Sequence, residues 1–314
     1  SGISGKRGWW TSIAPGDFDN DGNVDYILGN TGQNTFYRVS EKYPGRIYAK
    51  DFDKNGVYDA IPTLYLKDKE GKRKEFAAHT RDDLIKQINS MRLRFPFYHA
   101  FANATADSML TKEDRRDALV LEANTMQSVL LRNKGNGTFD LVPLPVQAQL
   151  STIDGMVVDD FNGDGNLDVV MNTNDFGTDV SVGRYDALNG LLLLGNGNGN
   201  FTPLSIAKSG IFIPGNGKAM VKLNGAGNRP LMVAAQNRGA LKVYATAKPL
   251  RLVSAGPSDA SALVKLKNGK MQKQEFYYGS SFLSQSARFL QVAEDVQNVE
   301  ITDTKGKKRT VSLK

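Results

Sequence analysis

An internal repeat of 62 residues constrains the fold of this 314-residue chain more than any other feature. Phe139 aligns with Phe201 inside two Gly-Asn-rich segments, and residues 157–171 align with residues 219–233 at the same offset. Each repeat reads as a strand, a polar loop, two further strands, a Gly-Asn turn and a fourth strand. Four strands that recur about every 40–60 residues predict the blades of a β-propeller, whose common repeats are about 40–50 residues long. One twisted sheet cannot bury both of its faces alone, so such sheets pack against one another.

Three nine-residue loops share one acidic pattern. Loop 1 (17–25) reads DFDNDGNVD, loop 2 (51–59) reads DFDKNGVYD and loop 3 (160–168) reads DFNGDGNLD. Oxygen-bearing side chains stand at positions 1, 3, 5 and 9, and glycine stands at position 6. Carboxylates this close repel one another unless a cation lies among them. A hard cation that takes six to eight oxygen ligands suits the spacing, which favours calcium over magnesium.

The loops differ from an EF-hand, which has Glu at position 12 and continues into a helix. Here the last acid stands at position 9 and a strand follows. A single copy would be equally consistent with an acidic hairpin that binds no ion, but three copies with the same flanks predict calcium.

We therefore predict three calcium ions, each bound by side chains at positions 1, 3, 5 and 9 and by the backbone carbonyl at position 7. Loop 1 carries four carboxylates and the other loops three, so loop 1 should bind at least as tightly. The expected ligands are Asp17, Asp19, Asp21, Asn23 and Asp25 in loop 1, Asp51, Asp53, Asn55, Val57 and Asp59 in loop 2, and Asp160, Asn162, Asp164, Asn166 and Asp168 in loop 3.

A fourth loop, residues 222–230, is predicted to bind no metal. It keeps the glycine at position 6, but Lys222, Ala226 and Pro230 replace three of the acids. Two alternatives remain open for Lys222. Its ammonium group donates hydrogen bonds to loop carbonyls in place of a cation, or it points into solvent.

The predicted fold class is all-β, with a propeller region at 1–247 that contains about five blades. Residues 45–66 open one blade, and residues 115–124 read as the later half of another. A helical insertion is expected at about 80–116, because it breaks the strand pattern and offers helix caps at Thr80 with Asp83 and at Thr111 with Asp114. Its aromatic cluster is expected to serve the packing of the insertion, and a binding face is the alternative; the cluster comprises Phe95, Phe97, Tyr98, His99 and Phe101.

From residue 248 the pattern changes to a small all-β domain at 248–314. It lacks acidic loops and Gly-Asn turns, and the dipeptides at 268–269 and 305–306 fit hairpin turns. Its expected strand segments are 261–278, 287–293, 296–303 and 307–313.

These motifs resemble two known families. The acidic loops and the NGTF and NGNF turns resemble FG-GAP or VCBS repeats, as in integrin α-chain propellers. The tail EFYYGSSFLSQSARFLQVA (275–293) is similar to the ASPIC/UnbV domain, whose pattern is close to G-x-G-Y-L-S-Q-S, although Ser281 and Phe282 replace its second Gly and its Tyr.

The resemblance implies a calcium-stabilised protein that is secreted or exposed on the outer membrane or cell surface. Such VCBS/ASPIC proteins are exported by Bacteroidetes-type bacteria and are related to cartilage acidic protein. Their propellers often have seven blades. We therefore expect further blades from the N-terminal part of the same precursor or from a larger complex.

Composition excludes several classes of function. The chain has no cysteine, so it has no disulfide, zinc-thiolate site or thiol nucleophile. Its net charge of +7 is scattered rather than gathered in a basic stripe, which argues against nucleic-acid binding. No apolar run is long enough to predict a transmembrane segment.

The expected function is non-enzymatic binding of a protein or glycan, because no G-x-S-x-G, P-loop or HExxH motif occurs. We interpret the Gly-Asn run at 195–200 as a structural turn and not as a phosphate loop. The alternative function is a calcium-dependent polysaccharide lyase or another glycan-active propeller enzyme. A lyase needs a base and cations beside the acidic sugar, and the sequence localises no such cluster.

Overall fold

A computed structural model describes residues 2–246, 251–280 and 282–313, so the predicted domain boundary at 247/248 and Ser281 of the tail motif lie outside the described residues. The chain forms two compact units, which we describe separately. Unit 1 comprises Ser1–Ser4, Trp10–Thr35 and Gln127–Lys314, and unit 2 comprises Gly5–Trp9 and Phe36–Met126.

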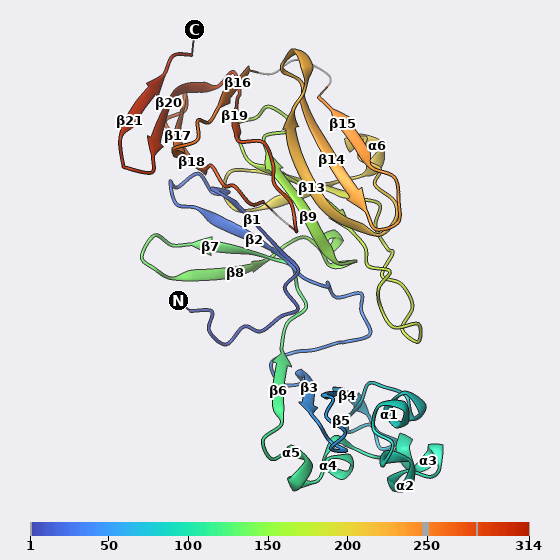
Figure 1. Ribbon diagram of the computed structural model, residues 1–314. Coiled ribbons are helices and arrows are strands. Elements are labelled where there is room, and N and C mark those ends of the chain that lie inside the picture. Colours follow the sequence, from blue (N-terminus) through green and yellow to red (C-terminus); the bar gives the residue numbers. More distant parts are fainter. Residues whose placement is uncertain (1, 247–250, 281, 314) are drawn as a thin grey trace. The chain divides into compact units, whose positions relative to one another are not determined.

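The first sheet of unit 1 is built from two hairpins that are far apart in the sequence (Figure 1). Tyr26 of the first hairpin pairs with Leu131 of the second, and all neighbouring strands are antiparallel. Unit 2 is thus inserted between the second and third strands of one sheet. The strand order is β1 (Ser12–Gly16), β2 (Asp25–Gly29), β7 (Val129–Asn133) and β8 (Phe139–Pro143).

Two further antiparallel sheets follow along the chain. The second sheet has four strands, and the third has three among the described residues. The second sheet consists of β9 (Ile153–Asp159), β10 (Asp168–Thr173), β11 (Leu191–Gly195) and β12 (Phe201–Leu204). The third consists of β13 (Gly217–Asn224), β14 (Pro230–Gln236) and β15 (Lys242–Ala245), and the short helical segments of unit 1 are η1 (Val146–Gln149), α6 (Ile206–Ser209) and η2 (Ala226–Asn228).

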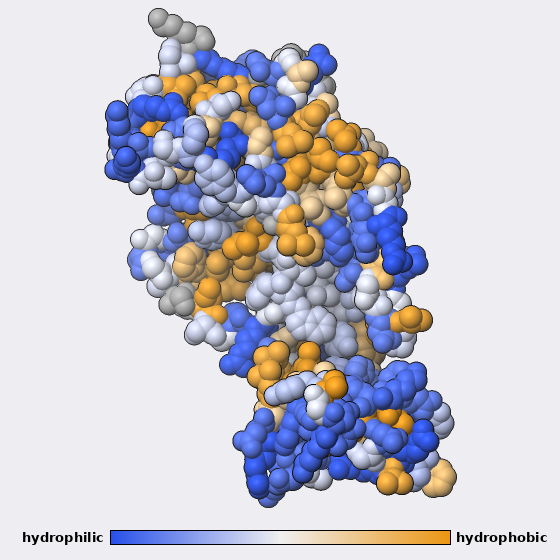
Figure 2. Space-filling view, in the orientation of Figure 1, coloured by the Kyte–Doolittle hydropathy of each residue, from blue (hydrophilic) through white to orange (hydrophobic). Residues whose placement is uncertain are grey.

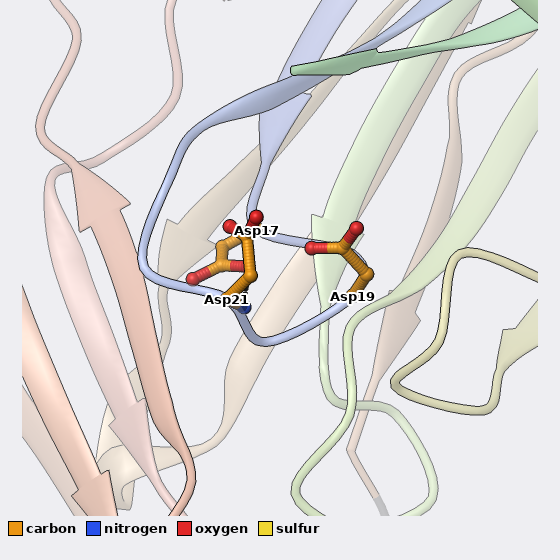
Figure 3. Close-up of side chains that lie close together, drawn as sticks. All are labelled: Asp17, Asp19 and Asp21. Carbon is orange, nitrogen blue, oxygen red and sulfur yellow. Dashed lines mark hydrogen bonds between the residues drawn. The ribbon is translucent and has the colours of Figure 1, made fainter. Parts of the chain in front are cut away.

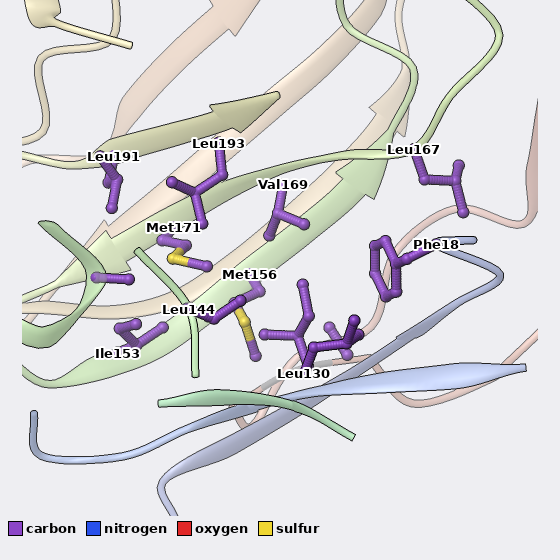
Figure 4. Close-up of a cluster of buried hydrophobic side chains, with 13 residues drawn as sticks. Phe18, Leu130, Leu144, Ile153, Met156, Leu167, Val169, Met171, Leu191 and Leu193 are labelled. Atoms are coloured by element: carbon purple, nitrogen blue, oxygen red, sulfur yellow. The ribbon is translucent and has the colours of Figure 1, made fainter. Parts of the chain in front are cut away.

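The main core of unit 1 lies between the first and second sheets (Figure 4). Phe18, Ile27, Leu130, Ile153 and Leu193 are almost completely buried in it. The buried positions alternate along β2 and include every residue of β10, as expected for a strand with one covered face and a strand with two. Burial of this apolar surface is the main force that holds the sheets together.

Residues 251–313, here called the C-terminal domain, form two small sheets with their own core of Ala262, Val264, Leu290, Val299 and Ile301. The predicted turns at 268–269 and 305–306 are confirmed, because each connects two paired strands and its glycine has a positive φ. One sheet pairs β16 (Arg251–Ser254) with β19 (Phe289–Val292), and the other has the order β18 (Met271–Glu275), β17 (Asp259–Leu266), β20 (Val296–Asp303) and β21 (Lys308–Val311).

Unit 2 combines a four-stranded sheet with the predicted helical segment. Both predicted helix caps are confirmed. The Thr80 side chain accepts the N–H of Asp83, and Thr111 forms a capping box with Asp114. The strand order is β5 (Arg73–Ala77), β4 (Asp59–Lys67), β3 (Gly45–Lys50) and β6 (Leu119–Ala123), and the helices are α1 (Arg81–Gln87), α2 (Met91–Arg94), α3 (Tyr98–Ala102), α4 (Ala106–Met109) and α5 (Lys112–Arg115).

The aromatic cluster of the helical segment is divided between the two predicted roles. Phe95 and Phe101 pack in the core of unit 2, with ring centroids 5.7 Å apart. Phe97 and Tyr98 are 63% and 64% exposed, so their rings do not serve that core.

The predicted count of five blades before residue 247 is wrong, because the described chain before that point holds four sheets. Residues 119–123 pair with β3 and complete the sheet that residues 45–66 begin, so residues 115–124 do not belong to a separate repeat. The all-β class is confirmed at the level of several small antiparallel sheets. No strand pairing among the described residues joins these sheets into a closed barrel.

Candidate metal centre

Loops 1, 2 and 3 have one backbone structure, built three times. The aspartate at position 1 accepts the N–H groups of positions 5 and 6 in every loop. The side-chain oxygen at position 5 accepts the N–H of position 7, and the aspartate at position 9 accepts the N–H of position 2. These bonds all lie within nine residues, so the local sequence is sufficient to specify them.

Two sharp bends turn each loop inward. Position 4 has a left-handed backbone in all three copies, at Asn20 (φ 57°), Lys54 (φ 60°) and Gly163 (φ 80°). The glycine at position 6 has φ between 81° and 89°, which a residue with a Cβ adopts only with strain. The glycine that the sequence places at position 6 is therefore required by the bend.

Loop 1 brings three carboxylates together (Figure 3). Asp17, Asp19 and Asp21 each offer an oxygen atom within 4.8 Å of the others. The Oδ1 atom of Asp19 is buried and has no hydrogen-bond partner among the described residues. The nearest paired cation is Arg132, whose Nε lies 3.8 Å from Asp19 Oδ2. A buried carboxylate oxygen without a donor is the group that a bound cation would satisfy.

Loop 2 forms a second group of three carboxylates, from positions 1, 3 and 9 instead of positions 1, 3 and 5. Asp51, Asp53 and Asp59 meet within the same 4.8 Å limit, and Asp53 Oδ1 is also buried without a partner among the described residues. Asn55 supplies position 5, and its oxygen accepts the N–H of Val57.

Loop 3 does not gather three acids in this way among the described residues. Asn162 occupies position 3, and Asp164 accepts hydrogen bonds from the side chain of Asn162 and from the backbone of Asn166. Loop 3 is therefore the weakest of the three predicted cation sites by the arrangement of its acids, although it carries as many carboxylates as loop 2 and has the same backbone.

The position-9 aspartates of loops 1 and 3 have a structural role that the sequence pattern does not reveal. Asp25 is fully buried and accepts the N–H groups of Phe18 (3.1 Å) and Asn133 (2.7 Å). Asp168 accepts the corresponding N–H groups of Phe161 (3.0 Å) and Gly195 (2.9 Å). Each carboxylate thus connects the start of its loop to the third strand of its sheet.

Burial makes these carboxyl groups unusually weak acids. It raises the pKa of Asp25 and of Asp168 from the ordinary value of 3.8 to about 7, and neighbouring aspartates act in the same direction. Burial also raises the pKa of Asp17 to about 6, against the effect of three backbone N–H donors. The metal-free loops therefore favour bound protons, whereas a cation favours the ionised form.

These shifts predict how calcium stabilisation depends on pH. Between pH 3.8 and about 7 the folded protein holds protons that the unfolded chain releases, so without metal the free energy of unfolding falls as pH rises through this interval. Calcium should offset that fall. We expect the increase in Tm on adding calcium to be larger at about pH 7.5 than at about pH 5.

Thermal denaturation followed by circular dichroism, with excess EDTA or with calcium, measures this difference. Asp25→Asn is the control, because an amide cannot titrate and the pH dependence should shrink. An equal calcium effect at both pH values would contradict the prediction.

Both predicted positions for Lys222 are wrong. Lys222 lies within β13, where it pairs with Met232, and its ammonium group forms an ion pair with Asp159 at 2.9 Å. The same Nζ atom lies 4.8 Å from the centre of the Phe289 ring. Strand β13 extends to Asn224, so residue 222 is not in a loop and cannot bond to loop carbonyls as a cation would.

The sequence gives no sign of the groups from distant segments that reach loop 1. Lys273 donates its backbone N–H to Asp17, and Gln272 reaches Asn20 with its side chain. Neither residue belongs to a motif, and both are separated from loop 1 by most of the chain. Only the folded arrangement identifies them.

The Gly-Asn run at 195–200 is confirmed as a turn, because it connects β11 to β12 and Asn196 accepts the N–H groups of Asn198 and Asn200. No helix within the described ranges is long and apolar enough to cross a membrane. No protein-family model, curated protein or solved structure matches the chain.

Proposed function

We propose that this chain is a non-enzymatic, calcium-stabilised module that binds a protein or glycan at a cell surface. The observation that supports the proposal is the loop structure that recurs three times, with a group of three carboxylates in loop 1 and another in loop 2. Hard cations with flexible oxygen coordination match such groups. The proposed location is outside the cell or on the outer membrane of a bacterium.

In this proposal the sheets of unit 1 are blades of a propeller of the FG-GAP type, and the C-terminal domain is of the ASPIC/UnbV type. Loop 1 connects β1 to β2, and loop 3 connects β9 to β10. In both sheets the acidic loop thus joins the first two strands. The further blades that complete the ring would come from the same precursor or from a larger complex.

A candidate binding surface lies over the third sheet. Figure 2 shows apolar residues gathered over β13–β15 and α6, and several large apolar side chains are exposed there. Exposed apolar patches on soluble proteins commonly mark interaction sites. The exposed residues are Ile206, Phe212, Leu223, Leu241 and Val243.

Calcium titration tests the metal part of the proposal. We expect dissociation constants of about 10⁻⁴–10⁻³ M, as for extracellular modules, with loop 1 at least as tight as loop 2. Asp19→Ala and Asp53→Ala, which leave no side-chain oxygen at position 3, should each remove one ion from the stoichiometry measured by isothermal titration calorimetry. Two results together would refute the proposal: no calcium binding in the titration, and no change in the Tm of the protein when chelator is added.

Binding to panels of polysaccharides and surface proteins tests the remaining part. Release of unsaturated sugars from an acidic polysaccharide would instead identify a lyase and overturn the non-enzymatic assignment.

A further inference from the structure

The C-terminal domain contacts loops 1 and 3 through strand β18. This strand lies at the edge of its sheet, so one side of its backbone is free to meet another part of unit 1. The backbone N–H of Lys273 donates to Asp17 Oδ2 at 2.8 Å. The side chain of Gln272, only 5% exposed, donates to Asn20 Oδ1 at 3.1 Å and to the carbonyl of Gly165 at 3.3 Å.

Two other residues of the C-terminal domain also contact loop 3. Gln291 donates its side-chain amide to the carbonyl of Asp160 at 2.7 Å. Asp295 lies against Gly165, where a Cβ would stand 2.2 Å from its carboxylate oxygen and would displace the Asp295 side chain. The two loops are also joined to each other, because Asn20 donates to Asn166 Oδ1 at 3.0 Å.

Asp17 belongs to both arrangements. It is one of the three carboxylates that meet in loop 1, and it is also the acceptor for Lys273. Asp19 and Asp21 repel Asp17 when no cation is present, and this repulsion favours an open loop. Opening of the loop moves the oxygen that holds β18.

We propose that a cation bound in loop 1 fastens the C-terminal domain to the sheets of unit 1 by fixing Asp17 and Asn20 as acceptors for Lys273 and Gln272. The inference rests on the proposed calcium binding and adds to it a conformational role. Loss of the cation releases β18 from the loops while the C-terminal domain keeps its own core.

Hydrogen exchange on the full chain tests the coupling at one amide. With dissociation constants near 10⁻³ M, about 10 mM calcium should slow exchange of the Lys273 N–H about tenfold relative to EDTA. Asp19→Ala should show fast exchange even with calcium, because it removes a cation ligand without changing either acceptor of β18.

Asp53→Ala is the matched control. It makes the same substitution at position 3 of loop 2, which belongs to the other compact unit, so Lys273 exchange should stay at the wild-type rate. Gln272→Ala provides a second test. If calcium in loop 1 strengthens the contact between β18 and the loops, weakening that contact must also weaken calcium binding, because the coupling between the two is reciprocal.

The outcomes separate the inference from the proposed function. If calorimetry shows calcium bound to loop 1 but Lys273 exchanges equally fast with calcium and with EDTA, the inference is wrong and the calcium site stands. If no calcium binds, the proposed function itself fails. Slower exchange with calcium in both the wild type and Asp53→Ala, but not in Asp19→Ala, supports the inference.

Discussion

Replacing Lys222 with methionine should lower the free energy of unfolding by about 2–4 kcal/mol, somewhat below the 3–5 kcal/mol typical of a fully buried pair. The Lys222 and Asp159 side chains are 17% and 7% exposed, so the pair is largely removed from water. Methionine keeps the apolar stem against Phe289 but leaves the Asp159 carboxylate without its cation. A buried unpaired charge is the main source of the loss.

A double-mutant cycle checks this explanation. Asp159→Ala in the Lys222→Met background should restore part of the lost stability, because it removes the unpaired charge. Urea unfolding measures all four proteins. If the two substitutions are additive, the ion pair contributes nothing and the prediction is wrong.

Replacing Asp168 with alanine should lower the free energy of unfolding by about 2–4 kcal/mol even in the presence of chelator, since two buried N–H groups lose their acceptor at about 1–3 kcal/mol each. Those donors belong to Phe161 and Gly195, which the carboxylate joins across the second sheet. The position-9 aspartate therefore stabilises the fold without any metal.

Asp164→Ala in the same loop is the control, because Asp164 is exposed and accepts only loop donors. Asp164→Ala should lower the free energy of unfolding by less than about 1 kcal/mol in the presence of chelator. Equal losses for the two variants, measured by urea unfolding in EDTA, would contradict the structural role of Asp168.

The sequence predicts the parts of the site whose bonds are local. Asp17 accepts the N–H groups of Asp21 and Gly22, only four and five residues away, so the nine-residue pattern is sufficient to specify these bonds. The same reasoning holds for the helix caps at Thr80 and Thr111. In these cases residue type and spacing determine which groups can meet.

The sequence does not predict contacts made across long separations. The pairing of Asp25 with Asn133 and that of Lys222 with Asp159 depend on which strands become neighbours. The strand pattern of residues 119–123 is equally compatible with several partners, and only the observed pairing with β3 places it in unit 2. Alternation along a strand fixes which face is buried, but it carries no information about the neighbouring strand.

The insertion of unit 2 into the first sheet sets the order in which a ribosome can deliver that sheet. Strands β1 and β2 emerge before β7, and the 99 residues from 30 to 128 must be synthesised before β7 appears, an interval on the order of 5–20 s at common elongation rates. During this time the edge of β2 is open and the nascent hairpin must wait. Pairing of β2 with β7 therefore closes a long loop, at an entropic cost that grows only slowly with loop length. We therefore expect slower translation of codons 36–126 to prolong the time for which the β2 edge is unpaired, although none of those residues belongs to the first sheet.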